Sequence, residues 1–394
     1  MFATKQTPYE QLLQNILENG FDHEDRTGVG RRSIFGVLNR YDLSGGKMPV
    51  PTTRKIYTRG SIGELILLFI RGSQRITEIK NNKIKFWDRW AVKEQNITDF
   101  VEELVKQAKP QQEEGLSEEE LKEKEQQFRE FMTAQLTKTT LDGIGPMYGA
   151  NWRNAPADGK ITPFHPVVPI EEMPSDKVAR YEAAWEKILG AQLEGVEITE
   201  EQLKLAKLDF FNQHYYGTVD QFNELIRNLK TRPHSSRLVV TAWIPASVPF
   251  EGMSPEKNVM IGKGALAACH VMFQCFVRPP KEEGGKKRLS LMMTQRSADV
   301  PVGVPHNVTQ YCALAHMLAH AVDMEADEFV HSIGDAHIYL NQIDNVKIQL
   351  QNEAYEDARI WINPEIKDIF KLGVDDVKVV DYKSHDPIEY EIAK

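Results

Sequence analysis

The sequence predicts an α+β fold in which a mainly antiparallel sheet packs against helices. Strands are expected at 237–243, 270–277 and 289–294, where β-branched and other apolar residues run together. The Pro- and Gly-rich run at 278–285 joins the last two, so these two strands should pair antiparallel. Helical patterns lie before and after the strands, and this order is typical of the α+β class.

The composition is that of a globular chain large enough for a full core. Its 394 residues are 41% hydrophobic and 27% charged, with a net charge of -9. An acidic surface repels nucleic acid and anionic membranes, so neither is an expected partner, although a few local arginines could still hold a small anion. The first residues show no basic region followed by an apolar run, and no stretch approaches the roughly 18 apolar residues of a membrane span. The expected location is the cytoplasm.

The chain has three cysteines, Cys269, Cys275 and Cys312, which form neither a CxxC pair nor an even disulfide framework. This usage fits a reducing compartment. His316 and His320 stand one helical turn apart, but the glutamate that a zinc protease carries beside its first histidine is missing. Two packed helix histidines are the simpler interpretation, and no metal is expected.

The first elements are a helix, a loop and a strand. A helix is expected at 9–19, because apolar residues recur on one face and Gly20 follows. The glycine-rich loop 25–30 precedes a strand at 33–41. Arg26 inside that loop is either a solvated residue or a forked donor to an anion.

The segment 60–72 is apolar on all sides, which indicates a helix buried in the core. Glu64 lies within it, and a buried carboxylate needs a partner whether it serves the helix dipole or a reaction. An aromatic cluster follows at 86–90 and, taken alone, is more often core than site.

Two polar blocks interrupt the apolar pattern, at about 93–140 and 155–216. In the first, a capping box begins a charged helix expected at 117–136. In the second, helices are expected at 175–189 and from Thr199 onward. Both blocks are interpreted as helical insertions.

Between the insertions, the segment 145–153 has two glycines around Tyr148, which predicts a tight turn that presents this side chain. The remaining elements are expected to be helices at 219–229, 307–323 and 341–351 and a strand at 328–333.

The apolar run 265–274 contains one thiol, Cys269, where the chain enters a strand. A buried free cysteine is most often a small hydrophobic residue, and this interpretation stays open on the residues alone. A Cys-His hydrolase is disfavoured, because neighbours on a strand point to opposite faces and His270 cannot easily reach the thiol. A nucleophile is the third interpretation, since the hairpin returns to an Arg-Ser-Asp cluster at 295–299 and an amide at 305–307 that could surround a small anionic substrate.

Eight short segments together resemble the signature blocks of the thymidylate synthase family, and they occur in the family order. They lie at 25–28, 64–65, 87–90, 145–153, 268–270, 295–300, 305–307 and 334–341. The resemblance implies the family's fold in a single catalytic domain, 1–394, with the two insertions added to it. It also implies a homodimer with shared sites.

For the reaction, the resemblance implies that Cys269 adds to C6 of a uracil nucleotide and makes C5 nucleophilic. C5 then captures the methylene of 5,10-methylenetetrahydrofolate, the co-substrate. Glu64 would manage protons at O4 through water, and Tyr148 would help to remove the C5 proton. Asn307 and Asp299 complete the implied catalytic set.

For the substrates, the resemblance implies a phosphate and sugar site and a folate site. The nucleotide residues would be Arg26, Arg237, Gln295, Arg296, Ser297, His337 and Tyr339, with Arg237 lent across the dimer interface. The folate residues would be Trp87, Trp90, Asp299 and Gly303. The neutral amide of Asn307 can donate to O4 and accept from N3–H, so the implied nucleotide is dUMP, whereas a carboxylate there would favour cytosine.

The chain departs from the family near the reacting carbon. It ends in a polar tail, 390–394, where the family is apolar, and Pro301 and His306 replace residues that are usually aromatic or aliphatic. Ala268 and Ser236 stand where the family usually has a proline and an arginine. Water exclusion decides whether hydride or water captures the methylene on C5.

These departures predict a dUMP hydroxymethylase, similar to those of viruses that build modified-base DNA. Trp87, Pro301, His306 and Lys394 would determine the product, 5-hydroxymethyl-dUMP, and tetrahydrofolate would leave unoxidised. A thymidylate synthase that makes dTMP and dihydrofolate is the alternative, with the same substitutions arising as neutral drift. A non-catalytic nucleotide or RNA binder on the same fold is a more distant alternative, because the nucleophile, the base-reading amide and most phosphate ligands are present.

Overall fold

The computed structural model describes residues 2–25, 27–107, 117–156, 170–192, 207 and 218–392. Its centre is a six-stranded sheet in the order β1-β2-β9-β8-β7-β6. The strands are β1 (Phe21–His23), β2 (Arg31–Asp42), β6 (Val239–Thr241), β7 (His270–Arg278), β8 (Arg288–Asp299) and β9 (Glu325–Tyr339). All neighbours pair antiparallel except β8 and β9, which are parallel. The predicted α+β fold with a mainly antiparallel sheet is confirmed.

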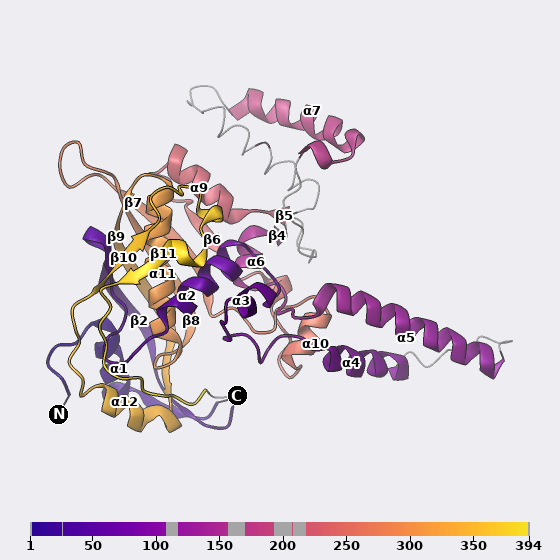
Figure 1. Cartoon of the computed structure of the whole chain (residues 1–394), viewed down its shortest axis with the longest axis horizontal. Helices are drawn as coiled ribbons and strands as arrows, with labels where there is room; N and C mark the ends of the chain where they lie inside the picture. The colour runs from indigo at the N-terminus through magenta and orange to yellow at the C-terminus, as the bar shows by residue number, and fades with distance from the viewer. Residues whose placement is uncertain are drawn as a thin grey trace.

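The helix α11 (Gly303–Ala321) packs on the centre of this sheet (Figure 1) and is buried along most of its length. Against α11 lies α2 (Thr58–Glu64), which continues as a π-helical turn, Leu65–Ile70, whose residues are all buried. The buried helix expected at 60–72 is confirmed, although its second half is wound more loosely than an α-helix. The other helices of the main body are α1 (Pro8–Asn19), α3 (Thr77–Asn81), α6 (Tyr148–Arg153), α9 (Gln221–Thr231), α10 (Pro255–Met260) and α12 (Ile343–Gln349).

A second, three-stranded sheet has the order β11-β10-β3. Its strands are β3 (Lys47–Met48), β10 (Ala358–Ile362) and β11 (Val377–Val380). Over the part of the chain that the structure describes, no helix combines the length and the apolar character needed to cross a membrane.

Each of the two polar blocks that are predicted to be insertions has its two ends side by side on the body. The Val92 N–H donates to Gly143 O at 3.0 Å, and the Asp142 N–H donates to Val92 O at 2.9 Å, so the two ends of the first block meet. The ends of the second are joined by β4 (Ala155–Pro156) and β5 (Thr218–Val219), which pair antiparallel.

The first block forms a helical hairpin that projects from the body (Figure 1). It consists of α4 (Glu94–Gln107) and α5 (Glu118–Thr140). Ser117 Oγ accepts from the Glu120 N–H, and the Glu120 carboxylate accepts in return from the Ser117 N–H. The predicted capping box is therefore confirmed.

Most other local predictions agree with the structure to within a few residues. The helix expected at 9–19 is α1, which Thr7 caps by accepting from the Tyr9 N–H. The helix expected at 175–189 is α7 (Ser175–Gln192), whereas the one expected from Thr199 lies outside the described residues.

The tight turn predicted at 145–153 is only half right. Gly145 does adopt a left-handed conformation, with φ 70°, but from Tyr148 the chain forms the helix α6. The helix packs directly on the π-helical turn, because a Cβ at Gly149 would lie 2.1 Å from Phe69 O. Close packing, which the local sequence does not reveal, turns the segment into a helix.

The strand predicted at 328–333 is too short. β9 runs on to Tyr339, because it lies between β2 and β8 and finds hydrogen-bond partners on both edges. This extension places Asp335 and His337 on the strand.

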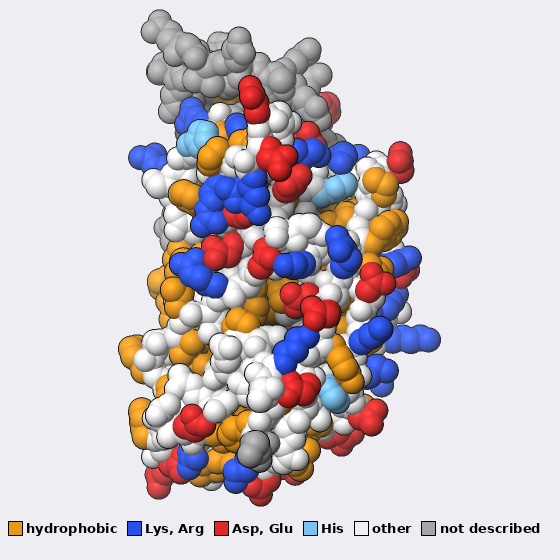
Figure 2. All heavy atoms as spheres, turned by 90° about the vertical axis from the view of Figure 1, so that its left-hand side faces the viewer, with side chains coloured by type: hydrophobic (Ala, Val, Ile, Leu, Met, Phe, Trp, Pro, Cys, Tyr) orange, Lys and Arg blue, Asp and Glu red, His pale blue; other side chains and the backbone are white. Residues whose placement is uncertain are grey.

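The face of the large sheet away from α11 carries exposed apolar side chains. The strand registers place Leu38, Phe276 and Met292 together on this face, and their exposed fractions are 54%, 61% and 39%. β2, β7 and β9 lie toward the left of Figure 1, and the molecule seen from that side shows hydrophobic side chains between charged ones (Figure 2).

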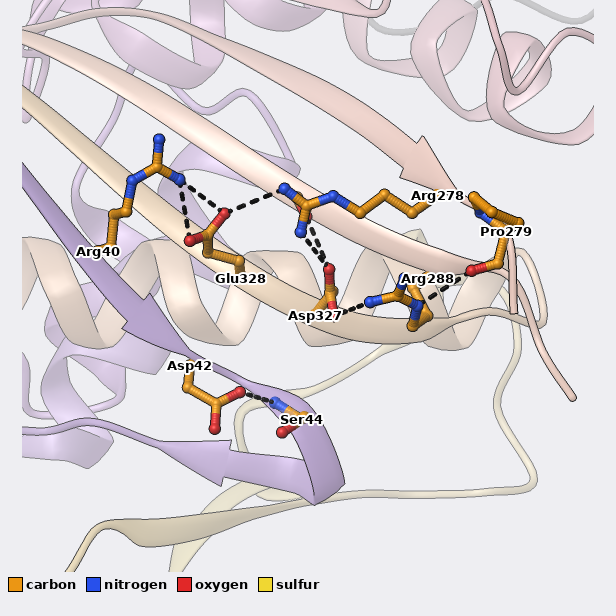
Figure 3. A network of polar contacts seen from close by, with 9 residues as sticks. Arg40, Asp42, Ser44, Arg278, Pro279, Arg288, Asp327 and Glu328 are labelled. Atoms are coloured by element: carbon orange, nitrogen blue, oxygen red, sulfur yellow. Dashed lines mark hydrogen bonds and ion pairs between the residues drawn. The ribbon is translucent and has the colours of Figure 1, made fainter. Parts of the chain in front are cut away.

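An ion-pair network crosses four strands at one end of the same sheet (Figure 3). Glu328 accepts from Arg40 at 2.9 Å and from Arg278 at 3.4 Å. Asp327 accepts from Arg278 at 2.5 Å and from Arg288 at 2.8 Å. Burial opposes the ionisation of Asp327, but the two arginines hold its pKa below the ordinary value. The network therefore ties β2, β7, β8 and β9 side by side.

Candidate active site

Cys269 lies directly before β7 and is partly buried. Its backbone N–H donates to the Tyr148 hydroxyl at 3.0 Å, and its carbonyl accepts from the Arg296 N–H at 2.9 Å. The first bond comes from α6 and the second from β8, so two separate elements fix the residue. Tyr148 itself has a φ of 29°, a conformation that strains a residue with a side chain.

The Arg296 guanidinium holds the chain just ahead of the thiol. Its Nε donates to Ala268 O at 2.9 Å and its Nη2 to Ala267 O at 3.0 Å, while its centre lies 5.6 Å from the Trp243 ring. Burial raises the pKa of the Cys269 thiol, and the positive charge of Arg296 opposes that rise. Arg296 thus favours the thiolate where burial disfavours it, and its side chain stays exposed enough to meet an anion.

Glu64, the last residue of α2, is buried between two donors. Trp87 Nε1 donates to its Oε1 at 2.5 Å, and Gln310 Nε2 donates to its Oε2 at 2.6 Å. Burial raises the pKa of Glu64 to about 7, and the two hydrogen bonds oppose this rise. A carboxyl group with a pKa near neutrality can both release and take up a proton, as the predicted role at O4 requires.

His306 makes a second polar contact between α11 and α2. Its Nδ1 lies 2.8 Å from the Ser61 hydroxyl, so this pair is one helical turn away from the contact between Glu64 and Gln310. The Phe86 ring packs edge-on against His306, with 5.1 Å between the ring centres. Burial lowers the pKa of His306 to about 4, so the ring is neutral at pH 7.

Asn307, the predicted base reader, follows directly on α11. Its Oδ1 accepts from Gln295 Nε2 at 3.2 Å, and Gln295 Oε1 lies 2.8 Å from Nε2 of the buried His331. His270 pairs with Gln295 across β7 and β8, and its ring packs 5.0 Å from that of Tyr148 in the core. Burial lowers the pKa of His270 to about 4, which agrees with its exclusion as the base of a Cys-His hydrolase.

Asp299 ends β8 shortly before Gly303, the first residue of α11. Its carboxylate accepts from the Val302 N–H and from Gln342 Nε2, both at 3.3 Å. Burial raises the pKa of Asp299 to about 6. Gln342 Nε2 also donates to Glu391 O at 2.9 Å, so it connects this predicted folate ligand to the C-terminal tail.

The tail lies against the body through polar contacts. Asn345 Nδ2 donates to Glu389 O at 2.8 Å, and the Tyr390 hydroxyl donates to Gln349 Oε1 at 2.7 Å. The Arg54 guanidinium lies 5.2 Å from the centre of the Tyr390 ring. Polar groups at the tail therefore have defined partners beside the site.

The structure places most other predicted residues around the same region. Trp87 is buried with its ring 5.6 Å from that of Trp90, and the carbonyl of the buried Pro301 accepts from Arg54 Nη2 at 2.6 Å. His337 is buried on β9 with its ring 5.2 Å from that of Tyr339.

Ser297 belongs to this cluster, whereas three other predicted residues lie apart from it or cannot be placed. Ser297 is partly buried on β8, where its carbonyl accepts from Gln295. Arg237 is exposed just before the edge strand β6. Arg26 and Lys394 lie outside the described residues.

Sequence reasoning missed several polar residues that contact predicted ones within the described part of the chain, and five of them have partners far away in the sequence. They are Arg54, Ser61, Gln310, His331 and Gln342. Their partners lie 36 to 247 residues away in the sequence, so no local pattern reveals the pairs. Only Ser61 and Gln310 left a signal, because a polar residue within an apolar buried helix needs a partner.

The fold and the site are those of an α+β enzyme in which a partly buried thiol shares a site with a carboxyl group of near-neutral pKa. The chain matches the family model described as thymidylate synthase over residues 7–394. It belongs to the thymidylate synthase family, which confirms the resemblance seen in the eight segments. The family transfers a one-carbon unit from 5,10-methylenetetrahydrofolate to dUMP, and membership makes the chain a one-carbon transferase. Among the described residues, no group of three His, Cys, Asp or Glu is arranged to hold a metal ion.

Replacing Glu64 by glutamine should change how stability depends on pH. The folded pKa of about 7 exceeds the ordinary value of 4.5, so unfolding releases a proton between these pH values and the wild type loses stability as pH rises through them. The glutamine side chain cannot ionise, and Gln310 Oε1, buried without a partner among the described residues, can accept its N–H after rotation. Between pH 4.5 and 7 the free energy of unfolding of the wild type should fall by about 3 kcal/mol relative to Glu64→Gln. Urea unfolding at a series of pH values measures the difference, and parallel curves would contradict it.

Proposed function

We propose that the chain is a dUMP hydroxymethylase. Cys269 Sγ bonds to C6 of dUMP, and C5 then bonds to the methylene carbon of 5,10-methylenetetrahydrofolate. The bond between that carbon and the folate nitrogen breaks, the C5 proton leaves, and an exocyclic methylene remains on C5. Water adds to this methylene and loses a proton while the thiolate leaves C6. The products are 5-hydroxymethyl-dUMP and tetrahydrofolate.

The hydrogen-bonded state of His306 carries this proposal. The Ser61 hydroxyl has one hydrogen and donates it to Tyr57 O at 3.3 Å, so it accepts from His306 Nδ1–H at 2.8 Å. This bond fixes the tautomer and leaves the Nε2 lone pair as an acceptor. Because the ring is neutral at pH 7, Nε2 can bind and polarise the attacking water, which an aliphatic or aromatic residue cannot do.

The position of His306 agrees with this role. It directly precedes Asn307, which would read O4 of the base, and C5 is bonded to the carbon that carries O4. On α11 it is also one turn from Gln310, the partner of Glu64. A water held by His306 would therefore lie near the reacting carbon and near the group that handles protons.

The polar tail supports the same product. The hydrogen bonds from Gln342 to Glu391 and from Asn345 to Glu389 bring backbone carbonyls to the edge of the site. An apolar tail would exclude water from the methylene, whereas these carbonyls can hold ordered water there.

Thymidylate synthase itself is the second candidate, because one observation favours it. Trp87 is only 7% exposed and packs against Trp90 and Tyr148, so an apolar wall remains at the site. Such a wall would protect the methylene until hydride arrives from tetrahydrofolate, and the products would then be dTMP and dihydrofolate.

The proposed enzyme is a homodimer built on the open face of the large sheet. The exposed Leu38, Phe276 and Met292 form an apolar surface there that a second copy would cover. Arg237 stands exposed at the edge of this sheet, where it can extend to the phosphate site of the partner.

The product assay tests the function directly. With dUMP and 5,10-methylenetetrahydrofolate, the wild type should give a nucleotide one oxygen atom heavier than dTMP and no dihydrofolate absorbance. His306→Phe removes the acceptor for water, so the share of dTMP and dihydrofolate should rise about tenfold. His320→Phe is the control, since His320 lies on the same helix but contacts Ile366 O, and its product should not change. Stoichiometric dihydrofolate with a methylated product from the wild type would overturn the proposal.

A further inference from the structure

A chain of hydrogen bonds runs from the buried His331 on β9 to the partly buried Asn307 on α11. His331 Nε2 lies 2.8 Å from Gln295 Oε1, and Gln295 Nε2 lies 3.2 Å from Asn307 Oδ1. His331 and Gln295 are 0% and 3% exposed. Neither takes part in the steps proposed above, although the chain ends on the side chain that would read the base.

One backbone carbonyl fixes the direction of the first amide. Gln295 Nε2 donates to Ser297 O at 3.0 Å. A carbonyl oxygen only accepts, so the end of Gln295 that faces it must be the NH₂ group, and Oε1 must face His331. His331 Nε2 must then carry the proton that is donated to Oε1.

The direction of the second amide follows from the first. The other N–H of Gln295 Nε2 points toward Asn307, so the nearer atom of Asn307 is Oδ1. The Asn307 side chain also forms a hydrogen bond with His270. Oδ1 keeps one lone pair for N3–H of uracil, and Nδ2 donates to O4. Cytosine has an unprotonated N3 and an amino group at these positions, so an acceptor would meet an acceptor and a donor would meet a donor.

His331 has one favoured form in this environment. Its Nδ1 is buried without a hydrogen-bond partner among the described residues, so a proton there would be unsatisfied and the Nε2–H tautomer is preferred. Burial lowers the pKa of His331 to about 3, which keeps the ring neutral at pH 7. The Phe329 ring stacks on it with 5.6 Å between centres and holds its plane.

We propose that His331, together with the Ser297 carbonyl, holds the Gln295 amide in the direction that orients Asn307 and thereby helps to select uracil over cytosine. It is a positioning residue, because it would touch no substrate. The inference rests on the proposed binding of a uracil nucleotide at Asn307, and it holds for either product of the reaction.

The test is equilibrium binding of dUMP and of dCMP to the full chain, without folate, measured by calorimetry. His331→Phe keeps a ring beside Phe329 but loses the donor to Gln295, so the Ser297 carbonyl alone still holds the direction of the Gln295 amide. dUMP should bind about tenfold more weakly, and the preference for dUMP over dCMP should fall by a similar factor. His331→Gln is the matched control, since it can still donate an N–H to Gln295 and should keep most of the preference.

Gln295→Glu tests the same series of hydrogen bonds at its middle residue. A carboxylate accepts from His331 but can donate neither to Ser297 O nor to Asn307 Oδ1, so the Asn307 amide should turn its NH₂ group toward the carboxylate. Oδ1 then faces the 4-position of the ring and suits the amino group of cytosine. The preference should move toward dCMP further than in His331→Phe.

A double-mutant cycle separates positioning from a structural role. In an Asn307→Ala background, His331→Phe should no longer weaken dUMP binding, whereas a structural effect would persist. Inorganic phosphate should bind all variants alike, and if His331→Phe fails to fold, Gln295→Glu decides the question. An unchanged ratio of dUMP to dCMP affinity in the folded variants would overturn the inference. A wild type that binds neither nucleotide would instead overturn the proposed function.

Discussion

Cys269→Ser is expected to abolish turnover, with a loss of about 10⁴-fold or more. Burial already raises the pKa of the thiol, and the charge of Arg296 only partly offsets this effect. A serine hydroxyl ionises far less readily than a thiol, so the same environment cannot produce a useful nucleophile from it. The loss should appear in the rate of product formation whichever product the enzyme makes. Intact-protein mass spectrometry should also show that the covalent nucleotide adduct is gone.

Cys275→Ala is the matched control for this experiment. Cys275 lies on β7, the strand that Cys269 directly precedes, but it is 1% exposed, and burial raises its pKa to about 12. Its replacement should lower stability through a small cavity and leave the turnover rate within a few fold of the wild type. An active Cys269→Ser enzyme, or equal losses in both variants, would refute the covalent mechanism.

Asn307→Asp is expected to reverse the choice of base. The carboxylate cannot donate to O4 of uracil, but it can accept from the amino group of cytosine while Gln295 still donates to its other oxygen. The value of kcat/KM for dUMP should fall about a hundredfold, and that for dCMP should rise above the wild-type level. Steady-state kinetics with each nucleotide measure both changes.

Asn345→Asp serves as the control for the base-choice experiment. This substitution also replaces an amide by a carboxylate. The Asn345 amide, however, donates from Nδ2 to Glu389 O in the tail. Its replacement should affect both nucleotides equally. If Asn307→Asp leaves the preference for dUMP unchanged, Asn307 does not read the base.

The parts of the fold that the sequence predicted are those with local signals. The capping box at Ser117, the glycine after α1 and the turn-rich run between β7 and β8 each act within a few residues. The parallel pairing of β8 with β9 was not predicted, because the helix α11 separates the two strands and only the assembled sheet sets their register. The length of β9 was missed for the same reason.

The same distinction between local signals and long-range contacts holds within the site. Cys269, Glu64 and Asn307 lie in segments that resemble the family, so their grouping was expected and the structure brings each into a hydrogen-bonded setting. The partners that set their properties were not expected. Ser61 and His306 are 245 residues apart, and His331 reaches Asn307 only through a side chain on another strand. These contacts depend on how elements pack, which one sequence does not reveal.

The closed ends of the two polar blocks, which we propose to be insertions, have an evolutionary consequence. Val92 with Gly143, and Ala155 with Val219, bridge the points at which the chain departs and returns. Each block can therefore lengthen, shorten or be exchanged while the catalytic framework keeps its geometry. The reason is that the entropic cost of closing a longer loop grows only slowly with its length. Lineages of such enzymes can thus acquire new surfaces without altering the chemistry beneath them.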